Sequence, residues 1–179
     1  MELEKLRGIE GVEVGLKIGG VDKGYIKDYY TKHEYQTTWE VYGLRINGVN
    51  IPYTASGILG EKATEIVIVL NTMTFTADSS AYGTVSQNKL LVLKNTTYTT
   101  SGKTLTLSDG RKVTANIADI DNLRTIFDGW SSTSGTVTSP TTVTAKFSAK
   151  PLEPEYIDLN FDVNGTRYTK RIWRSRSRT

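Results

Sequence analysis

The residue types that most often carry out catalysis or bind metal ions are sparse in this chain of 179 residues. His33 is the single histidine, so a nucleophilic triad or a zinc site would have to be assembled around one imidazole. The acidic residues are scattered, without the paired spacing that glycoside hydrolysis requires. We therefore expect no catalytic residue, no metal site and no cofactor, and we expect that the protein is not an enzyme.

Basic residues are concentrated at the C-terminal end. Six of them lie between Thr166 and Thr179 without an acid, so a net charge of +3 for the whole chain leaves −3 for the rest. Arginines spaced by serines beside a tryptophan can bind phosphate backbones or an acidic partner, and the alternative is a solvated terminus. The candidate contact residues are Arg167, Lys170, Arg171, Trp173, Arg174, Arg176 and Arg178.

Tyrosines and one tryptophan are concentrated in the first third of the chain. Tyrosine and tryptophan are enriched in protein interfaces, and they also occur in surfaces that bind sugars. The alternative is ordinary packing of amphipathic strands. The candidate aromatic interaction face consists of Tyr29, Tyr30, Tyr35, Trp39 and Tyr42.

The elements that must position these residues are predicted to be strands. Asn-Gly at 47–48 and 164–165, and Asp-Gly at 109–110, each separate two runs in which apolar and polar residues alternate. This pattern is typical of β-hairpins. Residues 54–63 are typical of a loop, and 66–70 of a strand that is buried on both faces.

One segment, 117–126, has apolar residues at helical spacing, with Asp119 as a candidate cap. The segment is short, so a single turn is an equal alternative to a helix. The acidic cluster 119–122 lacks the glycine and the later glutamate of an EF-hand loop, which favours the cap over a calcium site. The sequence therefore predicts a mainly β fold of antiparallel, hairpin-rich sheets with at most one short helix.

The most specific pattern lies in the middle of the chain. Phe-Asp-Gly-Trp at 127–130 is followed at 141–147 by Thr-Thr-Val-Thr-Ala-Lys-Phe. With shorter blocks at 74–77, 82–85 and 113–115, these residues resemble one divergent internalin B-repeat (Listeria–Bacteroides repeat) over about 74–147. Such repeats occur on bacterial surface proteins and as appended modules of phage proteins.

The resemblance implies a small β-grasp-like module that acts as a structural or adhesive spacer without catalytic residues. The chain holds one copy, whereas the family usually occurs in tandem, and 90–109 is longer and more hydrophobic than in a typical repeat. We expect Phe127, Trp130 and Phe147 to form the core of this module, since buried aromatic rings dominate small cores. The alternative is an exposed aromatic edge that binds sugar.

Three regions are predicted: a β-rich docking region over 1–70, the repeat-like module over 71–149, and a linker, hairpin and basic tail over 150–179. The chain has no cysteine, which excludes disulfides and thiolate metal sites. The first seven residues lack the apolar segment of a signal peptide, and the apolar run 66–70 is far shorter than a membrane span. We expect the protein to be assembled with its partners in the cytoplasm of a host cell.

These features favour a non-enzymatic structural subunit of a large assembly, namely a bacteriophage virion protein of the head, neck or tail, or a decoration of the particle. Its partners would be other virion subunits, including further copies of itself, and nucleic acid for the basic tail. The alternative is a bacterial cell-surface adhesin or carbohydrate-binding fragment, whose partner would be a glycan.

Overall fold

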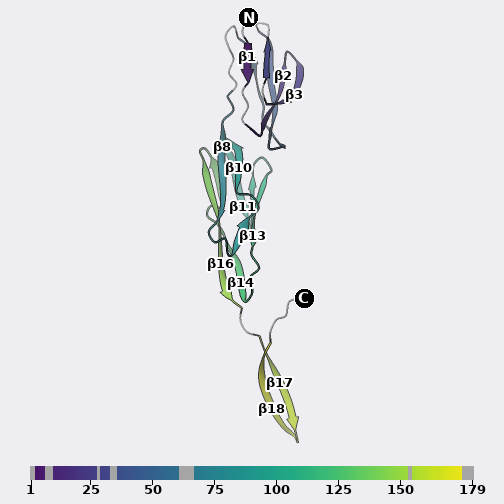
Figure 1. Ribbon diagram of the computed structural model, residues 1–179, viewed down its shortest axis with the longest axis vertical. Coiled ribbons are helices and arrows are strands. Elements are labelled where there is room, and N and C mark those ends of the chain that lie inside the picture. Colours follow the sequence, from purple (N-terminus) through teal and green to yellow (C-terminus); the bar gives the residue numbers. More distant parts are fainter. Residues whose placement is uncertain are drawn as a thin grey trace.

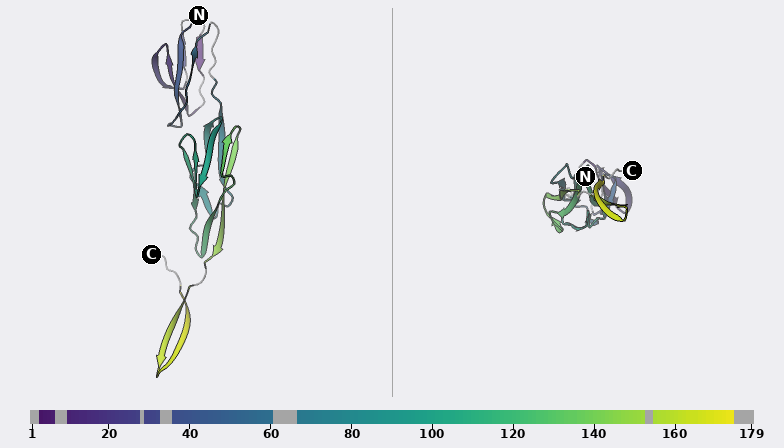
Figure 2. Two further views of the ribbon diagram at one scale, coloured as in Figure 1. Left: turned by 180° about the vertical axis from the view of Figure 1, so that it is seen from behind. Right: turned by 90° about the horizontal axis from the view of Figure 1, so that it is seen from below.

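The computed structural model describes residues 3–6, 10–27, 29–32, 36–60, 67–152 and 155–174. Within these residues every regular element is a β-strand and none is a helix, which confirms the predicted mainly β fold. The strands form three groups that follow one another along the long axis of the molecule (Figures 1 and 2).

The first group, the N-terminal module, is built around one long strand, β5. Strand β2 pairs along one edge of β5, β6 and β7 share the other edge, and β3 lies outside β2. Strands β1 and β4 form a separate two-stranded sheet. The bounds are β1 (Leu3–Leu6), β2 (Val12–Ile18), β3 (Val21–Ile26), β4 (Tyr29–Lys32), β5 (Thr38–Ile46), β6 (Val49–Ile51) and β7 (Ala55–Ile58).

The turn between β5 and β6 is the predicted Asn-Gly hairpin. Asn47 has φ 49° and Gly48 has φ 80°, the two positive values that a type I′ turn requires. Alternate residues of β2 and β5 point to one face of the sheet and form its core. This N-terminal core consists of Val12, Val14, Leu16, Val41, Leu44, Ile46 and Ile51.

The second group, the central module, consists of two sheets packed on a common core. The first sheet has the order β10-β8-β16-β14, with β8 and β16 parallel, and the second has the order β15-β11-β12-β13-β9. The bounds are β8 (Leu70–Ala77), β9 (Gly83–Val85), β10 (Lys89–Leu93), β11 (Thr96–Ser101), β12 (Thr104–Leu107), β13 (Lys112–Ile117), β14 (Leu123–Trp130), β15 (Ser134–Val137) and β16 (Thr141–Pro151).

Both sheets contribute buried residues to the core of the central module, for example Phe75 from β8 and Leu105 from β12. The two sheets therefore cover each other, as in a β-sandwich. Residues 67–152 are all described and contain no helix, so the β-grasp detail of the prediction is not confirmed.

The strand pair β8–β10 has apolar residues on both faces. On one face, Leu90 and Val92 contact the core of the central module, as do Met73 and Phe75 of β8. On the other face, Leu70, Leu91 and Leu93 pack against the N-terminal core, together with Ile68 of the preceding segment. The unusual hydrophobicity of 90–109 therefore has a physical reason in part, because β10 serves two cores.

Of the two alternatives for 117–126, the helix is wrong and a turn is observed. Strand β13 ends at Ile117, a turn follows, and β14 begins at Leu123 and pairs with β16. Asn122 has φ 64°, a left-handed conformation that ends a helix. The hydroxyl of Thr125 donates a hydrogen bond to the carbonyl of Ala118, which closes the turn.

Two further predictions are corrected by the sheet pairing. Residues 55–58 are not a loop but strand β7, which pairs with β5. The expected doubly buried strand over 66–70 is also wrong, because the strand begins at Leu70 while Val67 and Val69 are exposed. Ile66 lies outside the described residues.

The third group is the C-terminal hairpin, formed by β17 (Glu155–Val163) and β18 (Thr166–Arg174). Asn164 and Gly165 have φ 52° and 81°, so the third predicted Asn/Asp-Gly turn also joins two strands. The two strands pair only with each other among the described residues.

The ring of Phe147 occupies the space that a side chain at Gly83 of β9 would need. A Cβ at this position would lie 2.3–2.7 Å from ring atoms of Phe147, closer than real Cβ contacts. We predict that Gly83→Ala destabilises the central module by roughly 1–3 kcal/mol, because it overpacks a filled core. Chemical denaturation checks this, and Gly83→Ala combined with Phe147→Leu should recover part of the loss. An unchanged denaturation midpoint for Gly83→Ala would contradict the close packing of the Phe147 ring against Gly83.

Leu90 and Leu91 are neighbours in β10 that pack into different cores. We predict that Leu91→Ala lowers the stability of the N-terminal module and Leu90→Ala that of the central module, each by about 1–2 kcal/mol for a partly buried side chain. Unfolding followed by the fluorescence of Trp39 or of Trp130, in variants that keep one tryptophan, separates the two modules. If both substitutions lowered the stability reported by Trp39 and by Trp130 equally, the packing of Leu90 and Leu91 into different cores would be contradicted.

Candidate functional site

The predicted aromatic face is divided between two faces of the N-terminal sheet. The half-buried Trp39 packs against the N-terminal core, whereas the ring of Tyr42 fills the space beside Gly15 on the opposite face. Tyr29 and Tyr30 lie on β4, opposite residues of β1, and Tyr35 lies outside the described residues. Trp39 and Tyr42 therefore do not share one continuous surface.

Tyr42 belongs to a cluster of aromatic and charged side chains on the solvent-facing side of the sheet. Its ring meets that of Tyr25 edge-on, with centroids 5.6 Å apart. The guanidinium carbon of Arg45 lies 4.2 Å from the Tyr25 centroid, and Lys17 Nζ lies 5.5 Å from that of Tyr42. Both distances are typical of cation–π contacts.

Hydrogen bonds connect this cluster to Asp22. The Tyr42 hydroxyl donates to Asp22 Oδ1 at 2.9 Å, and the Gly24 amide donates to the same oxygen at 2.8 Å. The Gly24 amide, and then Tyr42, lower the pKa of Asp22 below its ordinary value. Desolvation, and then the bond to Asp22, raise the pKa of Tyr42. The cluster thus satisfies its own polar groups and stabilises the face.

Sequence reasoning missed Arg45, Asp22 and Lys17 in this cluster. Tyr25 belongs to the clustered tyrosines of the first third of the chain, but it was not among the residues of the candidate face. The available signal was the glycine Gly15 within an alternating strand, because such a glycine often makes room for a ring from the neighbouring strand.

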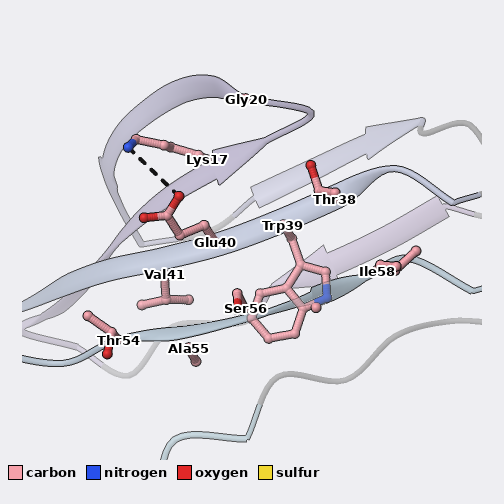
Figure 3. Close-up of a pocket in the computed structure, with 11 residues that line it drawn as sticks. Lys17, Gly20, Thr38, Trp39, Glu40, Val41, Thr54, Ala55, Ser56 and Ile58 are labelled. Carbon is pink, nitrogen blue, oxygen red and sulfur yellow. Dashed lines mark ion pairs between the residues drawn. The ribbon is translucent and has the colours of Figure 1, made fainter.

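A shallow groove of about 630 Å³ follows the β5–β7 pair (Figure 3). Lys17 and Glu40, 3.8 Å apart, project from one side of β5, and Trp39 projects from the other. The indole lies against Gly57, where a Cβ would be 2.7–2.8 Å from ring atoms. Thr38, Thr54 and Ser56 add hydroxyl groups. The indole and the charged pair therefore lie on opposite sides of the sheet, so one small molecule would not contact both. An aromatic ring with nearby polar groups is typical of small-molecule sites, including sugar sites.

The aromatic residues of the central module are core residues. Phe127 meets Trp130 and Phe147 edge-on, with centroids 5.9 Å and 5.6 Å apart. Trp130 and Phe147 are buried, and Phe127 is partly buried against the same core. These rings pack the module and do not present a sugar-binding edge.

The candidate residues of the basic tail fall on strand β18 or beyond it. Arg167, Lys170 and Arg171 are exposed on β18, and Trp173 and Arg174 form its end. Arg176 and Arg178 lie outside the described residues.

Two of these arginines lie opposite acidic residues of β17. Arg171 Nε lies 2.9 Å from Asp158 Oδ1, and this bond lowers the pKa of Asp158 and raises that of Arg171. Arg167 is the register partner of Asp162. The basic residues of β18 are therefore matched in part by acids of β17, which the one-dimensional charge count did not reveal.

The C-terminal hairpin has one apolar face. Cross-strand register brings together Ile157 with Ile172 and Phe161 with Tyr168, and Leu159 and Val163 continue the same side. We call these six residues the hairpin apolar face. Their exposed fractions range from 36% to 56%, and neither apolar core of the protein includes them. A contiguous exposed apolar patch is typical of an interaction site.

Other sequence candidates remain unassigned. His33 lies outside the described residues, and Asp119 and Asp121 lie in the turn between β13 and β14. In the described part of the chain no three histidine or acidic side chains gather as a metal site. That part also contains no helix of the length and hydrophobicity that crossing a membrane requires.

No protein-family model, curated protein or solved structure matches the chain. The resemblance to the internalin B-repeat therefore stays a prediction.

The bond between Tyr42 and Asp22 leads to a prediction about pH. A raised pKa means that folding favours the neutral phenol, so its contribution to stability is present below pH 10.0, the ordinary pKa, and is lost as pH rises through the raised value. In Asp22→Asn the Tyr42 pKa should move partway back down, because the charge is removed while desolvation stays. Titration of ¹³C-labelled tyrosine by NMR measures this. Asp128→Asn, on β14, is the control, and identical Tyr42 titrations in all three proteins would contradict the bond.

Proposed function

We propose that the protein is a non-enzymatic structural subunit of a large assembly, namely a bacteriophage virion protein of the head, neck or tail, or a decoration of the particle. The observation that carries this proposal is the uncovered hairpin apolar face. An isolated two-stranded hairpin is marginally stable in water, and six exposed apolar residues on one side favour contact with another molecule.

The arrangement of the modules supports the same proposal. The N-terminal and central modules share the β8–β10 pair, which couples them through two apolar contacts. The hairpin lies at the far end of the molecule from the N-terminal module (Figure 1). An elongated subunit with an apolar arm at one end is suited to project from a particle or to bridge two neighbours. In this proposal the hairpin docks and the modules project, which differs from the expectation that residues 1–70 also dock.

The groove beside Trp39 favours a second function, a cell-surface adhesin or carbohydrate-binding protein. Its aromatic ring and hydroxyl groups are of the kinds that bind sugars. However, one side of the indole already lies against Gly57, which reduces the ring surface that a sugar could use. We therefore place this function second.

The two functions predict different behaviour for the tagged chain in the cells that naturally produce it, or in their lysate. As an assembly subunit, it should sediment in a density gradient with particles many times larger than itself. Phe161→Lys, which places a charge on the hairpin apolar face, should reduce this incorporation at least tenfold. The neighbouring variant Asn160→Lys adds the same charge on the opposite face and should incorporate normally.

A chain that never sediments with larger particles would contradict the assembly function. Binding to a glycan array that is lost in Trp39→Ala, with unchanged unfolding behaviour, would establish the second function instead.

A further inference from the structure

We infer that the occupant of the hairpin apolar face is the same face of a second copy of the chain, so that two hairpins pack face to face as a four-stranded sandwich. This inference rests on the proposed assembly function and names the first contact in it. Two sheets packed in this way lie about 10 Å apart with their side chains interleaved.

The hairpin offers its partner little net charge on this side. Lys170, opposite Leu159, is the single charged residue among the four register rows from Ile157 to Val163, and the next row on the same side, Glu155 with Arg174, holds one acidic and one basic residue. The remaining side chains of the four rows are Thr166 and the six of the hairpin apolar face. A nucleic acid or an acidic protein would leave these apolar residues uncovered, whereas an equally apolar face would bury them.

The polar groups on the opposite side of the hairpin have partners within the hairpin. Asp158 and Arg171 form an ion pair at 2.9 Å, and the Thr169 hydroxyl donates to Asn160 Oδ1 at 2.7 Å. The Arg171 guanidinium also lies 6.0 Å from the Tyr156 ring. These groups need no external partner, so the unsatisfied side of the hairpin is the apolar one.

Two copies of the hairpin repel each other little. Residues 155–174 contain three acids and four basic residues, so two hairpins approach each other almost without net charge. Like charge on a docking surface is the usual barrier to self-association, and it is nearly absent in this segment.

Symmetry then determines how the faces meet. A two-fold axis along the hairpin places β17 of one copy over β18 of the other, and such a contact uses the same patch on both copies. Phe161 then faces Tyr168 of the second copy, and Ile157 faces its Ile172. The two Lys170 side chains leave the sandwich at opposite edges, where their ammonium groups reach water while their methylene chains cover Leu159.

Sedimentation equilibrium of the full chain over a wide concentration range tests the inference. The wild-type protein should show a monomer–dimer equilibrium that changes little with salt, because the contact is apolar. Phe161→Lys should shift the midpoint at least tenfold toward monomer, and Asn160→Lys should keep the wild-type value. A wild-type protein that stays monomeric at every concentration, or equal shifts in both variants, would overturn the inference.

Phe161→Lys could act by unfolding the hairpin, so a second measurement keeps the wild-type face. The chain has no cysteine, which allows a single spin label at Arg167→Cys, beside the hairpin turn and on the side opposite the hairpin apolar face. Parallel packing predicts a short label-to-label distance, set by the sheet separation of about 10 Å plus the label arms. A dimer without any short distance would overturn the face-to-face arrangement.

The two proposals fail in different ways. If the chain sediments with large particles but is a monomer when purified, the assembly function stands and the second copy is the wrong occupant. If it forms the hairpin dimer but never enters a larger particle, the dimer stands and the assembly function falls.

Discussion

A sheet with an apolar face has to bury that face, and the strand pair β8–β10 meets this requirement for two modules at once. Successive residues of β10 point alternately into the central core and toward the N-terminal core. Leu70 of β8 extends the second contact, and Met73 extends the first. A slip of one residue in this pair would exchange the two faces and expose both cores, so its register specifies how the modules are joined.

The apolar face of the C-terminal hairpin is not buried by any other described part of the chain. Its strands alternate as regularly as those of the other sheets, but no second sheet or module lies against the apolar side among the described residues. The free energy of burying six apolar side chains is therefore available to a partner. This is why the hairpin, and not the basic residues within it, carries the proposed function.

Local patterns in the sequence predicted the strands and turns well. The Asn-Gly turns at Asn47 and Asn164 lie where they were expected, because positive φ at both central residues favours few other pairs. The helix alternative for 117–126 failed because its helical spacing coincides with strand residues on either side of a turn. Asn122, which adopts a left-handed conformation there, was the overlooked signal.

Long-range features could be read from the sequence only in part. The pairing of Trp39 with Gly57 depends on the register between β5 and β7, so the groove was not predicted. The pairing of Arg171 with Asp158, by contrast, follows from the two-residue turn at Asn164, which fixes the register of the hairpin, so the charge matching was available from the sequence. The spacing of three residues between Trp39 and Tyr42 likewise places them on opposite faces of β5, because side chains of a strand alternate.

We propose that the C-terminal hairpin depends on a partner to cover its apolar face. Hydrogen exchange of backbone amides, measured on the wild-type chain at several concentrations, tests it most directly. We expect protection in β17 and β18 to rise with protein concentration, while protection in β8 and β16 stays constant because that core is covered within the chain. Strong hairpin protection that is already complete at the lowest concentration would contradict the account.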